Sequence, residues 1–134
     1  MAFDLDGTLI DTIPDMERAA NNMLSKLNLA SVNRKEVEAC VGAGLDYFIE
    51  TLILNCLNGK SASSNMLSDA NFIFRAEYEA AIACFSSVYP GVVDTLKMLK
   101  KKKIPIACIT NKPKFYADKT LASFNLNNFF KTVL

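Results

Sequence analysis

The chain of 134 residues contains no histidine, so any acid–base chemistry must use carboxylates, lysine or tyrosine. Its net charge of +1 gives no reason to expect binding to nucleic acid or to a membrane surface. No apolar run is long enough to span a bilayer, and the short acidic amino terminus is not typical of a signal peptide. With 51% hydrophobic residues, the composition is that of an ordinary soluble globular protein.

The cysteines are few and show no C-x-x-C pair. All four lie in apolar stretches of sequence: Cys40, Cys56, Cys84 and Cys108. Buried free thiols are the natural reading of such a pattern, and they favour a reducing compartment. We therefore expect a cytoplasmic protein.

The sequence F-D-L-D-G-T at residues 3–8 is the most informative feature present. Asp4 and Asp6 end a short apolar run and point to the same face, because side chains alternate along a strand. Gly7 allows a sharp turn that exposes backbone N–H groups. Asp4 is placed to attack phosphorus, and Asp6 to protonate the leaving oxygen and then activate water. Two close carboxylates also suit Mg²⁺; the competing interpretation is a solvated acidic turn.

Residues 13 to about 87 predict an all-helical block. Its apolar positions recur at helical spacing, and Asn33 followed by Glu36 is typical of a capping box. Residues 60–65 are small and polar, as in a loop. The expected helices run from Pro14 to about Asn28, briefly after Asn33, from Leu45 to Leu57 and from Asn71 to Phe85.

The remaining sequence alternates between helix and strand. Tyr89–Gly91 is a turn, and Pro90 suits the opening of a helix. The expected order is a helix to about Lys101, a strand Ile104–Ile109, a helix Lys114–Phe124 and a strand from Thr132. Strands that alternate with helices predict a parallel sheet, which the helical block interrupts after the first strand.

A second polar constellation, T-N-K-P at residues 110–113, lies where the strand Ile104–Ile109 ends and a helix begins. Ligands of open α/β sheets bind at such carboxyl ends. The Thr110 hydroxyl and the Asn111 N–H can hold a phosphate oxygen, and Lys112 can supply a cation. An ordinary polar loop that caps a helix is the alternative.

Together the two motifs resemble those of the haloacid dehalogenase-like hydrolase family. Residues 9–15 and 89–92 are similar to segments of its phosphoglycolate phosphatases. The resemblance covers nearly the whole chain and implies an α/β, Rossmann-like core with a parallel sheet and an inserted α-helical cap. The core would comprise residues 1–12 and 88–134, and the cap residues 13–87.

The resemblance also implies roles for single residues. Asp4 would be the nucleophile and Asp6 the acid/base. Mg²⁺ would be held by the Asp4 carboxylate and the Asp6 backbone carbonyl. The phosphate of a small phosphorylated substrate would be held by Thr110 and by backbone N–H groups around Asn111 and Gly7.

Further substrate-binding residues are expected in three places. Thr8 follows the first motif, and Lys112 belongs to the second. Gly42 and Gly44 match a glycine-rich cap loop that faces the catalytic carboxylates in the family, although a simple helix break explains them equally well.

The family pattern has two later parts, a lysine motif and an acidic motif that completes the metal site, and neither occurs in this sequence. A chain that ended at Leu134 is therefore expected to be incomplete and very slow or inactive. Its sheet would keep an open edge, which a missing chain segment or an oligomer would cover.

The leading hypothesis is a Mg²⁺-dependent phosphomonoester hydrolase that works through an aspartyl-phosphate and acts on a small phosphorylated acid. Two alternatives stay open. One is a non-catalytic phosphate-binding or interaction fragment, and the other is a sugar phosphomutase of the same fold.

Overall fold

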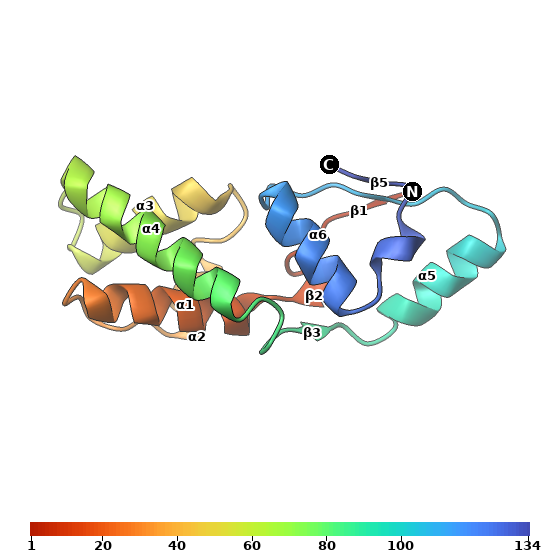
Figure 1. Cartoon of the computed structure of the whole chain (residues 1–134), viewed down its shortest axis with the longest axis horizontal. Coiled ribbons are helices and arrows are strands. Elements are labelled where there is room, and N and C mark those ends of the chain that lie inside the picture. Colours follow the sequence, from red (N-terminus) through yellow and green to blue (C-terminus); the bar gives the residue numbers. More distant parts are fainter. The chain divides into compact units, whose positions relative to one another are not determined.

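The computed structural model describes residues 1–134 and contains two compact units. The first unit consists of Met1–Thr12 and Ile82–Leu134, and the second of Ile13–Ala81. The second unit is thus inserted in the sequence of the first (Figure 1). The division falls between Ala81 and Ile82, earlier than the boundary near residue 87 that the sequence suggested.

A parallel sheet organises the first unit. Its strands are β1 (Ala2–Phe3), β4 (Ala107–Cys108) and β5 (Thr132–Val133), in the order β1-β4-β5. Phe3 lies opposite Cys108, and Cys108 lies opposite Val133. The Ile109 N–H extends this ladder by donating to the Phe3 carbonyl at 2.8 Å. The predicted α/β class with a parallel sheet is confirmed, with strands shorter than expected.

Three helical segments connect these strands (Figure 1). They are α5 (Val92–Lys101), α6 (Lys114–Ser123) and the short 3₁₀ helix η1 (Asn127–Phe129). The sequence suggested that this helix opens at Pro90, but α5 begins at Val92. Gly91 takes a left-handed φ of 85° and is the N-cap. Buried Leu96 and Leu121 pack with Leu5 and Cys108 in one hydrophobic core.

A short antiparallel pair of strands was not predicted. Strand β2 (Ile10–Asp11) pairs with β3 (Ser87–Val88), and the Tyr89 N–H adds a hydrogen bond to the Leu9 carbonyl at 3.1 Å. The pair lies where the chain leaves the first unit and returns to it. It therefore fixes the segment that directly follows the first motif.

The second unit contains only helices. They are α1 (Ile13–Lys26), α2 (Arg34–Glu38), α3 (Leu45–Cys56) and α4 (Ser64–Ala80). Asn33 caps α2 as predicted, since its side chain accepts the Glu36 N–H at 2.9 Å. The expected start of the last helix at Asn71 is wrong, because Ser63 accepts the Met66 N–H at 3.1 Å and begins α4 much earlier.

Aromatic side chains fill the interior of this helical unit. Phe48 and Phe74 have ring centroids 5.5 Å apart, and Phe74 stacks on Tyr78 at 5.8 Å. All three are almost completely buried. Such pairs add to the free energy gained by burial, so they anchor α3 against α4.

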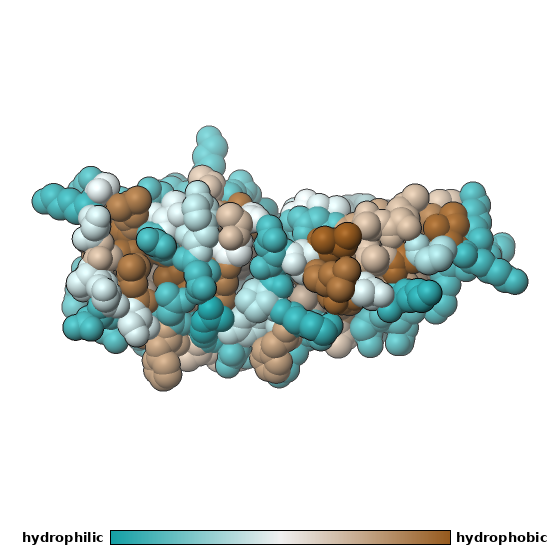
Figure 2. Space-filling view, turned by 90° about the horizontal axis from the view of Figure 1, so that it is seen from above, coloured by the Kyte–Doolittle hydropathy of each residue, from teal (hydrophilic) through white to brown (hydrophobic).

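No helix is both long and apolar enough to cross a membrane. The face shown in Figure 2 mixes hydrophilic residues in teal with intermediate ones and with separate hydrophobic patches in brown. Single exposed hydrophobic side chains are normal on protein surfaces.

One carboxylate links α4 to α1. Glu77 accepts hydrogen bonds from Asn22 at 2.9 Å and from Lys26 at 2.8 Å, and Arg18 lies 3.7 Å from it. These three partners follow one another at intervals of four residues, so they share one face of α1. The hydrogen bond from Lys26, followed by that from Asn22, lowers the pKa of Glu77 from its usual 4.5.

We predict that Glu77→Gln lowers the free energy of unfolding at neutral pH by about 1 kcal/mol. Because the pKa of Glu77 is lowered in the folded state, its contribution is present above the ordinary pKa of 4.5 and is lost as the pH falls through the folded value. Urea unfolding measures the effect. Glu38→Gln is the matched control, since Glu38 is half-exposed and pairs with Arg34 one turn away. Equal losses in both variants would contradict the prediction.

Candidate active site

The first motif forms a tight loop at the carboxyl end of β1. Leu5 is completely buried and anchors the loop in the core, while Asp4 is exposed and Asp6 partly buried. The N–H groups of Leu9 and Ile10 both donate to the Leu5 carbonyl, at 3.1 and 3.2 Å. The alternation predicted from the sequence thus separates an apolar anchor from two carboxylates.

Gly7 makes the turn of this loop. Its φ of 78° lies in the left-handed region that favours glycine, while a Cβ there would meet nothing within 4 Å. Glycine is therefore favoured at position 7 by the backbone conformation, and not by a lack of space for a side chain. The Gly7 N–H donates to the Ile10 carbonyl at 2.9 Å, so in this structure it is already used within the loop. The Asp6 N–H and carbonyl take part in none of the loop's backbone hydrogen bonds.

The two carboxylates have different surroundings. Asp4 Oδ1 accepts the Leu5 N–H at 2.7 Å, and no hydrogen bond engages Asp4 Oδ2. Asp6 Oδ1 accepts the Thr12 hydroxyl at 2.6 Å and lies 3.0 Å from Lys112 Nζ. Asp4 is therefore open on one oxygen, whereas Asp6 is held by two side chains.

The second motif meets the first at this point. Thr110 follows β4, and its N–H donates to the Leu134 carbonyl at 2.8 Å. The Thr110 hydroxyl oxygen accepts the Lys112 N–H at 3.1 Å, which leaves the hydroxyl proton available to a ligand oxygen. The structure thus brings Asp4, Asp6, Thr110 and Lys112 to one end of the sheet.

Asn111 lies between Thr110 and Lys112 in this loop, just before α6. Gly42 and Gly44 belong to the helical unit, with φ of 126° and 93°, and Gly44 is the N-cap of α3. Their backbone conformations favour glycine, as a loop at a helix start requires. The substrate-binding roles expected for all three residues stay predictions.

Two residues of the site were missed by sequence reasoning. Thr12 is completely buried and bonds Asp6 six residues earlier in the chain. Cys108, at the end of β4, is also completely buried, and its pKa is raised to about 11. Burial is the largest cause, followed by the negative charges of Asp4 and Asp6. A neutral thiol therefore lies close to the two carboxylates.

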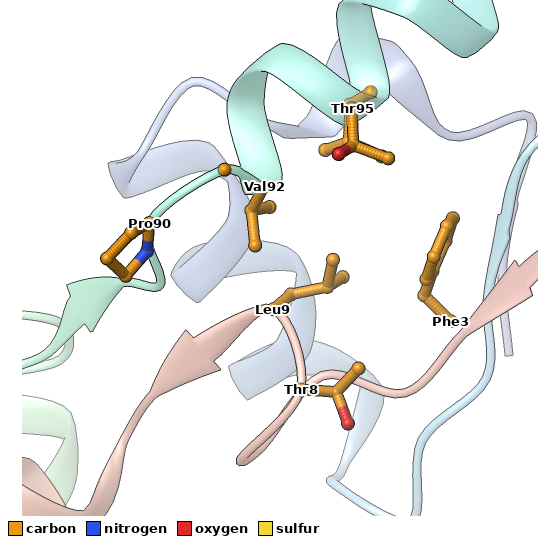
Figure 3. Close-up of a pocket in the computed structure, with 8 residues that line it drawn as sticks. Phe3, Thr8, Leu9, Pro90, Val92 and Thr95 are labelled. Carbon is orange, nitrogen blue, oxygen red and sulfur yellow. The ribbon is translucent and has the colours of Figure 1, made fainter.

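A separate pocket of about 250 Å³ borders the motif loop on another side (Figure 3). Thr8 and Leu9 line it together with Phe3 of β1 and the start of α5, while Asp4 and Asp6 do not. Figure 3 shows the Leu9 side chain reaching into the pocket between Val92 and Phe3. Its lining is mainly apolar, so this pocket does not suit a phosphate group.

The fold and the site define a class of α/β protein with paired carboxylates and a Thr-Asn-Lys loop at the carboxyl ends of adjacent parallel strands. A family model described as haloacid dehalogenase-like hydrolase matches residues 1–134. The chain belongs to this family, as its motifs suggested.

Named relatives agree with this assignment. The chain is 35% identical over 132 residues to a phosphoglycolate phosphatase of Pseudomonas savastanoi pv. phaseolicola, covering 98% of this chain and 48% of that protein. It is 33% identical over 134 residues to a phosphoglycolate phosphatase of Neisseria meningitidis serogroup A, covering 100% of this chain and 57% of that protein. The chain thus spans about half the length of the curated relatives it matches.

Solved structures share the fold. The crystal structure of a predicted phosphoglycolate phosphatase from Haemophilus somnus 129pt matches with a TM-score of 0.94 and 27% identity, covering 99% of this chain and 60% of that chain. A predicted phosphatase from Clostridium acetobutylicum matches with a TM-score of 0.82 and 22% identity, covering 99% and 58%. The second likeness shows the fold alone.

The raised pKa of Cys108 generates a prediction about its reactivity. Because only the thiolate is alkylated, Cys108 in the folded protein should resist iodoacetamide at about pH 8 and react faster only as the pH approaches 11. Cys84 is exposed in the same unit and is the internal control. Peptide mass spectrometry after timed alkylation measures both rates. Equal rates in the native protein would contradict the burial of Cys108 beside the carboxylates.

Proposed function

We propose that the whole protein containing this chain is a phosphatase that hydrolyses phosphomonoesters through an aspartyl-phosphate, with a small phosphorylated acid such as phosphoglycolate as its substrate. The observation that carries the proposal is the placement of Asp4 and Asp6 beside the Thr110 loop at the carboxyl end of the sheet. The substrate class is supported by the phosphoglycolate phosphatases to which the chain is similar.

Asp4 would be the nucleophile. Its Oδ1 is occupied by the Leu5 N–H, so Oδ2 is free to attack phosphorus. As the new bond between oxygen and phosphorus forms, the ester bond to the leaving oxygen breaks. Exposure of Asp4 at the loop is consistent with access by a small substrate.

Asp6 would carry the proton in both half-reactions. Protonated on Oδ2 while Oδ1 keeps its two donors, the Asp6 carboxyl gives this proton to the leaving alkoxide and becomes a carboxylate. That carboxylate then takes a proton from a water molecule, which attacks the phosphorus of the aspartyl-phosphate and releases inorganic phosphate. Asp4 is regenerated as a carboxylate and Asp6 as the acid, so protons and charges balance over the cycle.

The second loop would bind the phosphate. The Thr110 hydroxyl has a proton to donate, because its oxygen already accepts the Lys112 N–H. The Asp6 N–H is a further donor that the loop does not use. Helix α6 begins at Lys114, and a helix start favours an anion.

Magnesium is the cofactor that these donors would suit. The structure contains no cluster of three or more histidine, cysteine or acidic side chains that could hold a metal ion. Mg²⁺ commonly keeps several waters and uses one or two carboxylates with the substrate phosphate, so such a cluster is not required. The Asp4 carboxylate and the Asp6 carbonyl, which accepts no backbone hydrogen bond, would be the ligands that these residues contribute. When bound, the ion would neutralise charge on the phosphoryl oxygens.

We predict that Asp4→Asn lowers the Mg²⁺-dependent release of inorganic phosphate by about 10³-fold or more, because an amide cannot act as the nucleophile. The assay uses the whole protein, 2-phosphoglycolate and a colorimetric phosphate measurement, with no sugar bisphosphate added. Asp118→Asn is the matched control, since Asp118 is half-exposed on α6 and pairs with Lys114. Undiminished release by Asp4→Asn would overturn the role of Asp4, and a requirement for a sugar bisphosphate would point to a phosphomutase.

A further inference from the structure

Among the lysines that form ion pairs in the first unit, Lys112 has the most buried side chain. Its side chain is 6% exposed, and that of its partner Asp6 is 15% exposed. The pair joins residues that are 106 positions apart in the sequence. By contrast, Lys114, two residues further on, is 69% exposed and pairs with Asp118 on its own helix.

Lys112 and Thr12 act on the same atom. Both lie within hydrogen-bond distance of Asp6 Oδ1, at 3.0 Å for Nζ and 2.6 Å for the hydroxyl. No hydrogen bond engages Asp6 Oδ2. A carboxylate fixed on one oxygen by two donors from different segments keeps a defined orientation, and its other oxygen is left without a hydrogen bond.

Lys112 also fixes the second motif. Its N–H donates to the Thr110 hydroxyl oxygen at 3.1 Å, while its ammonium group holds Asp6. One residue therefore sets the spacing between the group that would transfer the proton and the hydroxyl that would hold the phosphate. An ammonium group that moved fully to a substrate phosphate would leave a partly buried carboxylate without its cation, which is costly.

We propose that Lys112 is a positioning residue for Asp6. Together with Thr12, Lys112 holds Oδ1 of Asp6, so that Oδ2 of Asp6 faces the leaving oxygen and the attacking water. The inference deepens the proposed phosphatase function and rests on it for the identity of the reaction. It differs from the role suggested by the sequence, in which Lys112 binds the substrate phosphate directly.

Kinetics of the whole protein separate the two roles. If Lys112 positions Asp6, Lys112→Met lowers kcat about 100-fold, since small misplacements of a catalytic group cost that much. KM for 2-phosphoglycolate and the affinity for inorganic phosphate then change little, and Lys112→Arg recovers part of kcat. If Lys112 instead binds phosphate, KM rises and phosphate affinity falls while kcat is kept, and the proposal is overturned.

Two further variants sharpen this test. Thr12→Val removes the other donor to Oδ1, and it should lower kcat in the same way. Because both donors act through one atom, the double variant Lys112→Met/Thr12→Val should lose less kcat than the product of the two single fold-losses. Strictly multiplicative effects would contradict a shared action. Lys119→Met is the control and should keep the wild-type kcat and KM, because Lys119 is exposed further along α6, where its ammonium group lies over the Phe115 ring at 4.8 Å.

A crystal structure of the Lys112→Met variant gives a readout that is independent of activity. If that variant does not fold, a crystal structure of Thr12→Val replaces it. The proposal expects the Asp6 carboxylate to turn away from its wild-type orientation. An unchanged Asp6 would overturn it. A wild-type protein without phosphatase activity would refute the proposed function, and the orientation of Asp6 in the variant would still decide the role of Lys112.

Discussion

The ion pair between Lys112 and Asp6 is the constraint on which the arrangement of the site depends. A largely buried ammonium group needs a partner, because an isolated charge away from water is strongly unfavourable. Asp6 is that partner at 3.0 Å, so the loop after β1 and the loop after β4 are held together. The parallel pairing of β1 with β4 brings the two loops to the same end of the sheet, and the ion pair fixes their side chains within it.

In the loop after β1, neighbouring residues alternate between packing in the core and facing the candidate site. Leu5 lies between two carboxylates and is completely buried, so it secures the loop without entering the site. Gly7 supplies the left-handed conformation of the turn. Cys108 adds a buried thiol close to Asp4 and Asp6, and its raised pKa keeps that thiol uncharged near two carboxylates. A third negative charge there would oppose the binding of an anionic phosphate.

Much of this was predictable from local patterns, because strand alternation, helical spacing and the two motifs are visible in the sequence. The parallel sheet, the helical block and the Asn33 cap follow from such patterns. The pairing of β2 with β3 could not be predicted, since two-residue strands carry no periodic signal. The partner of Lys112 was missed for a related reason: a lysine beside a phosphate-binding loop suits a phosphate and a carboxylate equally well, and only the fold shows that Asp6 is within reach.

The direct test of an Asp4 nucleophile is to trap its phosphorylated form. The whole protein would be mixed with Mg²⁺ and 2-phosphoglycolate, quenched, and treated with borohydride, which reduces an acyl phosphate to an alcohol. Peptide mass spectrometry should then find homoserine at Asp4, only when substrate is present and not in Asp4→Asn. Phosphate release during turnover with Asp4 unmodified, or a phosphoryl group on another residue, would contradict the mechanism.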